Sequence, residues 1–172
     1  MSVLYISDLA GLEANVAAVQ PGKVITLLAP GGTPPPELPG LTAENRLCLF
    51  FHDVTEPTDP AWVLPAAHHV EAILGFGRDI PASGLLVHCF AGFSRSTAAA
   101  LALLALHNPG GEDEAARRLR AASAHAVPNP LLIALADAAL ACDGRLRRAL
   151  QAMPPATSQA YGGLMRLDLA LR

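Results

Sequence analysis

The chain has 172 residues, of which 52% are hydrophobic and 16% are charged. A chain of this length and apolar content can bury a sizeable core and is not disordered. Its net charge of −3 at pH 7 excludes the strongly basic surface that nucleic-acid-binding domains present. We therefore expect one globular domain over residues 1–172 that does not bind nucleic acid.

The same sequence carries no membrane or secretion signal. Its longest apolar run, residues 98–106, is far shorter than the ~20 residues that span a bilayer. The first eight residues lack the basic region of a secretory signal. Three cysteines without a CxxC pair argue against a disulfide framework or a zinc ribbon. We expect a cytoplasmic protein that makes no membrane contact and holds no metal.

Four apolar runs rich in strand-forming residues predict β-strands. They lie at residues 3–6, 23–28, 46–52 and 85–87. The second strand is followed by residues 29–40 (APGGTPPPELPG), which must form a loop because proline and glycine dominate it. The third strand is followed by turn residues at 53–60.

Helical segments separate and follow these strands. A short first helix, capped by Asp8, ends near residue 18, and Pro65 obscures the start of the second. The later helices are expected at residues 61–76, 96–107, 112–124, 130–141 and 145–152. Residues 154–172 have weaker signals and are expected to be a peripheral or weakly ordered tail. This order predicts an α/β domain with a small, mainly parallel central sheet flanked by helices.

Residues 85–97 (LLVHCFAGFSRST) carry the chemistry, because they predict a buried strand, a tight loop and a helix. Backbone N–H groups of such a loop can point inward and bind an anion, helped by the positive end of the helix. Gly92 permits the compact backbone, and Arg95 supplies a planar fork for two phosphate oxygens. Cys89 then lies beneath the anion, where these groups favour its thiolate.

The segment HCFAGFSRS, residues 88–96, resembles the active-site loop of the cysteine-based protein tyrosine phosphatases. Its HCxAGxSRS form is similar to the dual-specificity branch. A weaker resemblance extends from about residue 24 to residue 140, including an acid-bearing loop and the segment Pro128–Asn129 ahead of a late helix. The resemblance implies a phosphatase-like fold with a strand–phosphate loop–helix core.

The resemblance also implies roles for individual residues. Cys89 is the nucleophile, Arg95 grips the phosphate, and Ser96 donates a hydrogen bond to the sulfur. His88 orders the loop behind the cysteine, and Asn129 is expected to bond to the phosphate loop. The residues expected to surround the substrate phosphate are Phe90, Ala91, Gly92, Phe93, Ser94 and Arg95. This chemistry needs no metal and no organic cofactor.

The general acid has three candidates, Asp53, Glu56 and Asp59, which share the loop after the third strand. Asp53 lies 36 residues before Cys89 and Asp59 lies 30, and the usual spacing in the family is nearer that of Asp59. We favour Asp53, because the acid of the family closely follows its strand and this loop can absorb an insertion.

The expected activity is hydrolysis of phosphotyrosine, extending to phosphoserine and phosphothreonine, through a cysteinyl-phosphate. The partner is a phosphorylated protein or peptide, or an aryl phosphate. Uncharged side chains at positions 90, 91, 93 and 94 disfavour polyphosphorylated inositol lipids. Two alternatives are a phosphate-binding module without turnover and a rhodanese-like sulfurtransferase, although HCxAGxSRS is not the rhodanese pattern. The sequence predicts no oligomeric state.

Overall fold

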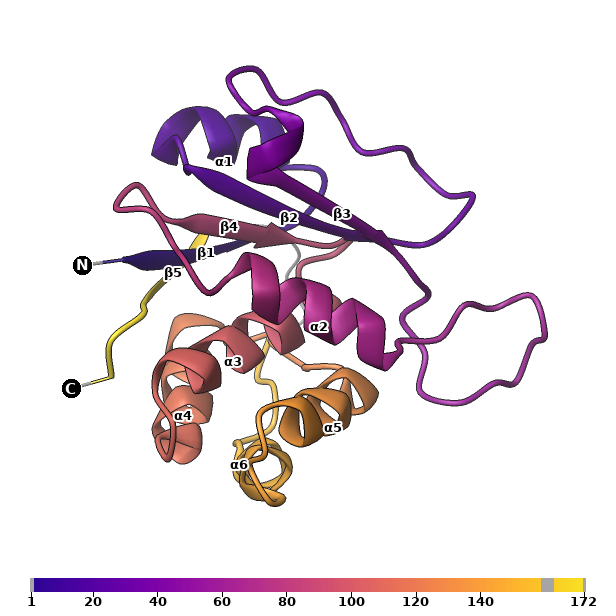
Figure 1. Cartoon of the computed structure of the whole chain (residues 1–172), viewed down its shortest axis with the longest axis vertical. Coiled ribbons are helices and arrows are strands. Elements are labelled where there is room, and N and C mark those ends of the chain that lie inside the picture. Colours follow the sequence, from indigo (N-terminus) through magenta and orange to yellow (C-terminus); the bar gives the residue numbers. More distant parts are fainter. Residues whose placement is uncertain (1, 159–162, 172) are drawn as a thin grey trace.

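The chain forms a five-stranded sheet with helices on both faces (Figure 1). The computed structural model describes residues 2–158 and 163–171. The strands are β1 (Val3–Ser7), β2 (Lys23–Leu28), β3 (Arg46–Phe50), β4 (Leu85–His88) and β5 (Met165–Asp168). Their order in the sheet is β3-β2-β4-β1-β5. The first four run parallel and β5 is antiparallel to β1, so the predicted mainly parallel sheet is confirmed.

The helices divide unequally between the two faces. Helix α1 (Leu12–Val19) covers one face (Figure 1), where Val24 and Leu86 of the strands pack against it. The helices of the other face are α2 (Ala67–Phe76), α3 (Arg95–His107), α4 (Glu112–Ala122), α5 (Pro130–Ala139) and α6 (Arg145–Ala152). A short 3₁₀ helix, η1 (Ala43–Asn45), precedes β3.

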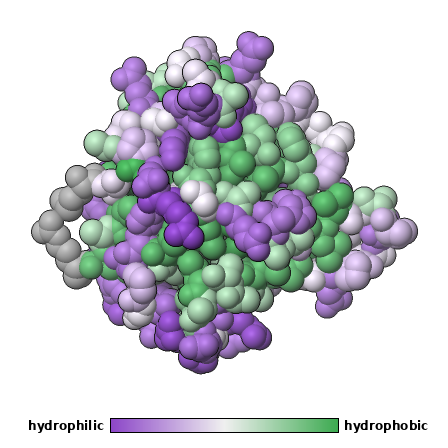
Figure 2. All heavy atoms as spheres, viewed as in Figure 1, coloured by the Kyte–Doolittle hydropathy of each residue, from purple (hydrophilic) through white to green (hydrophobic). Residues whose placement is uncertain are grey.

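Helix α3 is the centre of the larger core. Residues 95–105 are all buried, because α3 packs against β1 and β4 on one side and against α2, α4 and α5 on the other. Its run of alanine and leucine suits this position, since a helix that is apolar all round must be enclosed. Figure 2 shows hydrophobic atoms gathered over the middle of this view, with hydrophilic atoms toward its top and bottom.

The main differences from the prediction are two helix starts and one additional strand. Helix α2 begins at Ala67 rather than residue 61. Pro65 disfavours the helical conformation at Leu64 before it, and Ala66 after it is still extended. Helix α1 begins at Leu12, since the Asp8 side chain caps a turn by accepting the Gly11 N–H at 2.8 Å. The expected tail contains β5, which pairs with β1 at the sheet edge.

Within the described residues, no helix is long and apolar enough to cross a membrane. Residues 159–162 and 172 of the expected tail lie outside the described part of the chain.

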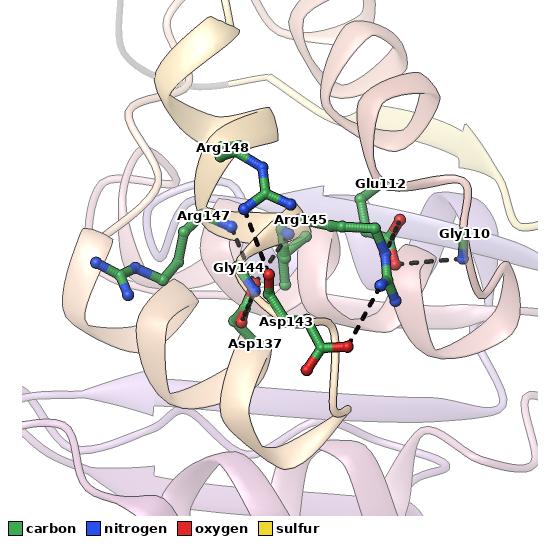
Figure 3. A network of polar contacts seen from close by, with 9 residues as sticks. Gly110, Glu112, Asp137, Asp143, Gly144, Arg145, Arg147 and Arg148 are labelled. Carbon is green, nitrogen blue, oxygen red and sulfur yellow. Dashed lines mark hydrogen bonds and ion pairs between the residues drawn. The ribbon is translucent and has the colours of Figure 1, made fainter.

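A polar network joins α4, α5 and α6 (Figure 3). Asp137 of α5 caps α6 by accepting the N–H groups of Leu146 and Arg147 at 2.9 and 3.2 Å. Glu112, only 2% exposed, accepts the Gly110 N–H at 3.2 Å and the Arg145 Nε at 3.4 Å. Carboxylates at helix starts are stabilised by the unpaired N–H groups there. The network therefore fixes α6 against α4 and α5, the two of these helices that pack against α3.

Glu112→Gln tests this network. Burial alone would raise the pKa of Glu112, but hydrogen bonds from its own N–H, from Gly110 and from Arg145 outweigh burial and hold the pKa below 4.5. A lowered folded pKa gives stability that is present above the unfolded value and lost as the pH falls through the folded value. We expect the variant to lose about 2 kcal/mol of unfolding free energy at pH 7. That difference should shrink as the pH falls below 4.5.

Urea denaturation of both proteins measures this difference. Glu44→Gln, at an exposed carboxylate of η1, is the matched control and should change little. A deficit for Glu112→Gln that persists unchanged at low pH would contradict an ionised role for Glu112.

Candidate active site

The candidate site lies at the edge of the sheet where the parallel strands end. Strand β4 ends at His88, Cys89 follows it, and α3 begins at Arg95. The carboxyl ends of parallel strands are the usual place for ligands in open α/β sheets. The loop after β3, with its three candidate acids, leaves the same edge (Figure 1).

Cys89 is buried, with 2% of its surface exposed. Its Sγ lies 3.2 Å from the Ser96 Oγ and accepts the Gly92 N–H at 3.2 Å. The Cys89 sulfur thus lies within hydrogen-bonding distance of a backbone N–H of the loop and of a hydroxyl in the first turn of α3.

Gly92 is required by geometry. Its φ is +74°, and a Cβ at this position would lie 3.2 Å from the Asp8 nitrogen and 3.3 Å from the Ser7 oxygen. Nearby, the Leu9 N–H donates to the Phe90 carbonyl at 3.1 Å. The phosphate loop is therefore pressed against the end of β1, and only glycine fits at the closest approach.

Arg95 is 6% exposed, which is unusual for a guanidinium. Its Nη1 donates to the Phe51 carbonyl at 2.8 Å, which ties α3 to the end of β3. Its Nε is buried and has no hydrogen-bond partner among the described residues. No carboxylate of that part of the chain forms an ion pair with Arg95. A buried cation with an unused donor is suited to bind an anion.

His88 lies on the face of the sheet that α1 covers, where its Nε2 is 2.8 Å from the Thr26 Oγ1 of β2. Burial, opposed in part by the Cys89 backbone, lowers the pKa of His88 from 6.5 to about 4. The imidazole is neutral at pH 7 and anchors the start of the loop to β2. Sequence reasoning missed Thr26, because nothing in the chain near it suggests a polar role.

Of the three candidate acids, Asp53 is the one that contacts the phosphate loop. Its Oδ1 accepts hydrogen bonds from the Ser94 Oγ at 2.7 Å and the Asn129 Nδ2 at 2.8 Å. Asp59 instead accepts the Ala61 N–H within its own loop, and Glu56 is exposed. Two donors on Oδ1 leave Oδ2 of Asp53 as the atom able to carry a proton.

Asn129 joins three elements through its different atoms. Its Oδ1 caps α5 by accepting the Leu131 and Leu132 N–H groups at 3.0 and 3.1 Å. Its own N–H donates to the Ser94 carbonyl at 3.3 Å, and its Nδ2 reaches Asp53. The predicted bond from Asn129 to the phosphate loop is therefore made by its backbone, while its side chain positions Asp53.

His52 closes the base of the acid loop, residues 53–63, as its place beside Asp53 suggested. Its N–H donates to the Val63 carbonyl at 2.7 Å, and its Nδ1 accepts the Val63 N–H at 3.0 Å. These two bonds hold His52 in place, so the backbone of Asp53, the next residue, is also held in place. In the sequence, only the position of His52 directly before Asp53 indicated this role.

No group of three or more His, Cys, Asp and Glu in residues 2–158 and 163–171 could hold a metal ion. The loop side chains Phe90, Ala91 and Phe93 surround the site without charge. Phe90 is 62% exposed, and the Phe93 ring lies 4.8 Å from the His125 ring. Arg95 is hence the one side chain of residues 89–95 that carries a positive charge.

Comparison with solved structures identifies which known fold the chain has. No model of a protein family and no curated protein sequence matches the chain. Human DUSP28 superposes with a TM-score of 0.56 at 24% identity, over 88% of this chain and 95% of its own. The Cydia pomonella phosphatase PTP-2 has a TM-score of 0.61 at 18% identity, over 78% and 84%. DUSP15 has a TM-score of 0.57 at 22% identity, over 90% and 94%. The chain therefore has the fold of the dual specificity phosphatases.

Proposed function

We propose that this protein is a phosphatase that hydrolyses phosphotyrosine in proteins or peptides, in a substrate class that extends to phosphoserine and phosphothreonine. One observation carries the proposal. The buried guanidinium of Arg95 has an unpaired Nε and no acidic partner in the described chain, in the loop that surrounds the Cys89 sulfur. A dianionic phosphate satisfies both the charge and the open donor.

The first step is transfer of the phosphoryl group to sulfur. The thiolate of Cys89 attacks phosphorus while Arg95 and the loop N–H groups hold the equatorial oxygens. The bond from phosphorus to the substrate oxygen breaks, and that oxygen takes a proton from Oδ2 of Asp53. The products of this step are the free alcohol or phenol and a cysteinyl-phosphate.

The second step returns the enzyme to its starting state. Water attacks phosphorus and gives a proton to the Asp53 carboxylate, so the same group now acts as base. The phosphorus–sulfur bond breaks, inorganic phosphate leaves, and the Cys89 thiolate re-forms. The Ser96 hydroxyl, 3.2 Å from the sulfur, stabilises the departing thiolate.

The alternatives have less support. A sulfurtransferase has no need for a carboxylic acid tied to the anion loop, whereas Asp53 is bonded to Ser94 of that loop. A binding module without turnover has no need for a buried thiol with two donors, whereas Cys89 has both.

The first test compares hydrolysis of p-nitrophenyl phosphate and phenyl phosphate by four variants and the wild type. Cys89→Ser should lose at least about 10⁴-fold in kcat, because it lacks the nucleophile. Asp53→Ala should lose about 10²-fold or more, and the loss should be larger for phenyl phosphate, whose leaving group needs the proton most. Asp59→Ala and Glu56→Ala should stay close to the wild type.

Each other outcome has a meaning. A selective loss in Asp59→Ala or Glu56→Ala would move the acid to that residue. Reduced wild-type protein that binds vanadate but turns over neither ester would support the binding module. Turnover of thiosulfate in place of aryl phosphates would support the sulfurtransferase.

Asn129→Asp separates capping from positioning. The new side chain keeps an oxygen that can cap α5 but cannot donate to Asp53. Its second carboxylate oxygen replaces the donor nitrogen, which lies 2.8 Å from the Asp53 Oδ1. A neighbouring like charge disfavours ionisation of an acid. We expect the falling, alkaline limb of the pH–rate profile for phenyl phosphate to move to higher pH.

Thermal melting provides the control, since the variant should keep most of the stability that Asn129→Ala loses with the cap. An unchanged pH profile at lowered stability would reduce Asn129 to a structural cap.

A further inference from the structure

A hollow of about 360 Å³ adjoins the phosphate loop. Phe90 and Ala91 of the loop also line the hollow, so a substrate bound at Cys89 would lie beside it. The remaining lining comes from the turn after β1 and from the loop after β2. The lining residues are Asp8, Leu9, Ala10, Thr33, Phe90 and Ala91. The hollow is mostly apolar, and no basic side chain lines it.

The exposed apolar side chains of the described residues gather near the same edge. The large hydrophobic residues with exposed side chains are Phe50, Trp62, Val63, Phe90 and Val127. Phe50 ends β3, and Val63 closes the acid loop against His52. Val127 donates its N–H to the Phe93 carbonyl of the phosphate loop at 2.9 Å. The mouth of the site is therefore apolar on several sides, which is typical of a surface that meets another molecule.

The three segments that hold Asp8, the candidate acids and the phosphate loop are negative apart from Arg95, and Arg120 lies beyond them, where its Nη2 donates to the Ala126 carbonyl at 2.7 Å. Residues 8–10, 53–63 and 88–95 contain a single Lys or Arg, which is Arg95. The carboxylates of these segments are Asp8, Asp53, Glu56 and Asp59. A bound phosphate occupies Arg95, so a second phosphate or an acidic side chain beside it finds carboxylates and no cation. Like charges brought together at an interface are costly.

We propose that this edge selects singly phosphorylated peptides in which an apolar side chain flanks the phosphotyrosine. The flanking side chain enters the hollow beside Phe90 and Ala91, and acidic or phosphorylated neighbours are rejected by Asp8 and the acid loop. This inference rests on the proposed function, since the hollow is a substrate subsite only if Cys89 and Arg95 process the phosphate. Charge and continuity with the phosphate loop identify its occupant.

The test uses phosphotyrosine peptides that differ only in the two flanking residues, which are Leu, Ala or Glu. An apolar pocket discriminates by tenfold or more for a side chain it accepts. We expect kcat/KM for the Leu peptide to exceed that for the Ala peptide by about tenfold. The Glu peptide should fall below the Ala peptide by a similar factor at low salt, and added salt should narrow that gap.

Thr33→Lys tests whether the hollow causes the discrimination. Thr33 is exposed on the rim and is not part of the phosphate loop. The new cation should raise the Glu-to-Ala ratio of kcat/KM by about threefold to tenfold. Ala82→Lys adds the same charge at an exposed site before β4, at the opposite edge of the sheet, and should leave the ratio unchanged. Ratios within one variant cancel any change in its overall activity.

The outcomes separate the two proposals. Hydrolysis of p-nitrophenyl phosphate with equal use of the three peptides, or with preference for the Glu peptide, would overturn the selectivity and leave the phosphatase intact. The same holds if Ala82→Lys shifts the ratio as much as Thr33→Lys does. Failure to hydrolyse p-nitrophenyl phosphate and every peptide would overturn the proposed function, and the selectivity with it.

Discussion

The burial of one guanidinium without an acidic partner is the constraint on which the site depends. Removing a cation from water is costly unless a counter-charge or a full set of acceptors replaces the solvent. Arg95 receives one backbone acceptor, the Phe51 carbonyl, and keeps an unpaired Nε. The remaining compensation has to come from anions. The phosphate of the proposed substrate is such an anion, so the buried charge of Arg95 favours its binding.

That constraint explains why distant segments converge on the loop. The end of β1 presses on Gly92, the end of β3 holds Arg95, and Thr26 of β2 holds His88. In a loop that binds an anion, the backbone N–H groups point inward and cannot bond to carbonyls of the same loop. Such a loop is therefore held in place by contacts from neighbouring segments. The acid is part of the same framework. Asp53, the proposed proton donor, accepts hydrogen bonds from Ser94 and from Asn129, the cap of α5.

Much of this was predictable where chemistry and local structure share one short segment. The segment from His88 to Ser96 predicts a strand end, a loop and a helix start. It also contains the thiol of Cys89 and the guanidinium of Arg95, the two groups on which the predicted chemistry depends. The choice of acid was less secure, because spacing favoured Asp59 while position after the strand favoured Asp53. Only the tertiary structure shows that Asp53 bonds to Ser94 and Asn129, which supports Asp53 as the proposed acid. Strand β5 was missed, since a four-residue edge strand has little hydrophobic pattern of its own and depends on its pairing with β1.

Backbone and side chains of the phosphate loop have different roles, and selectivity between substrates depends on residues around the loop. In the proposed function its N–H groups and Arg95 bind the phosphate, which all phosphate esters have in common. The side chains of Phe90 and Ala91 face the hollow and are not needed for charge. Discrimination between esters therefore has to come from contacts made by the rest of the substrate. The side chains around the hollow are mostly apolar, with Asp8 among them. In the proposed function, discrimination between phosphotyrosine peptides therefore depends on the size and charge of the flanking residues rather than on the phosphate itself.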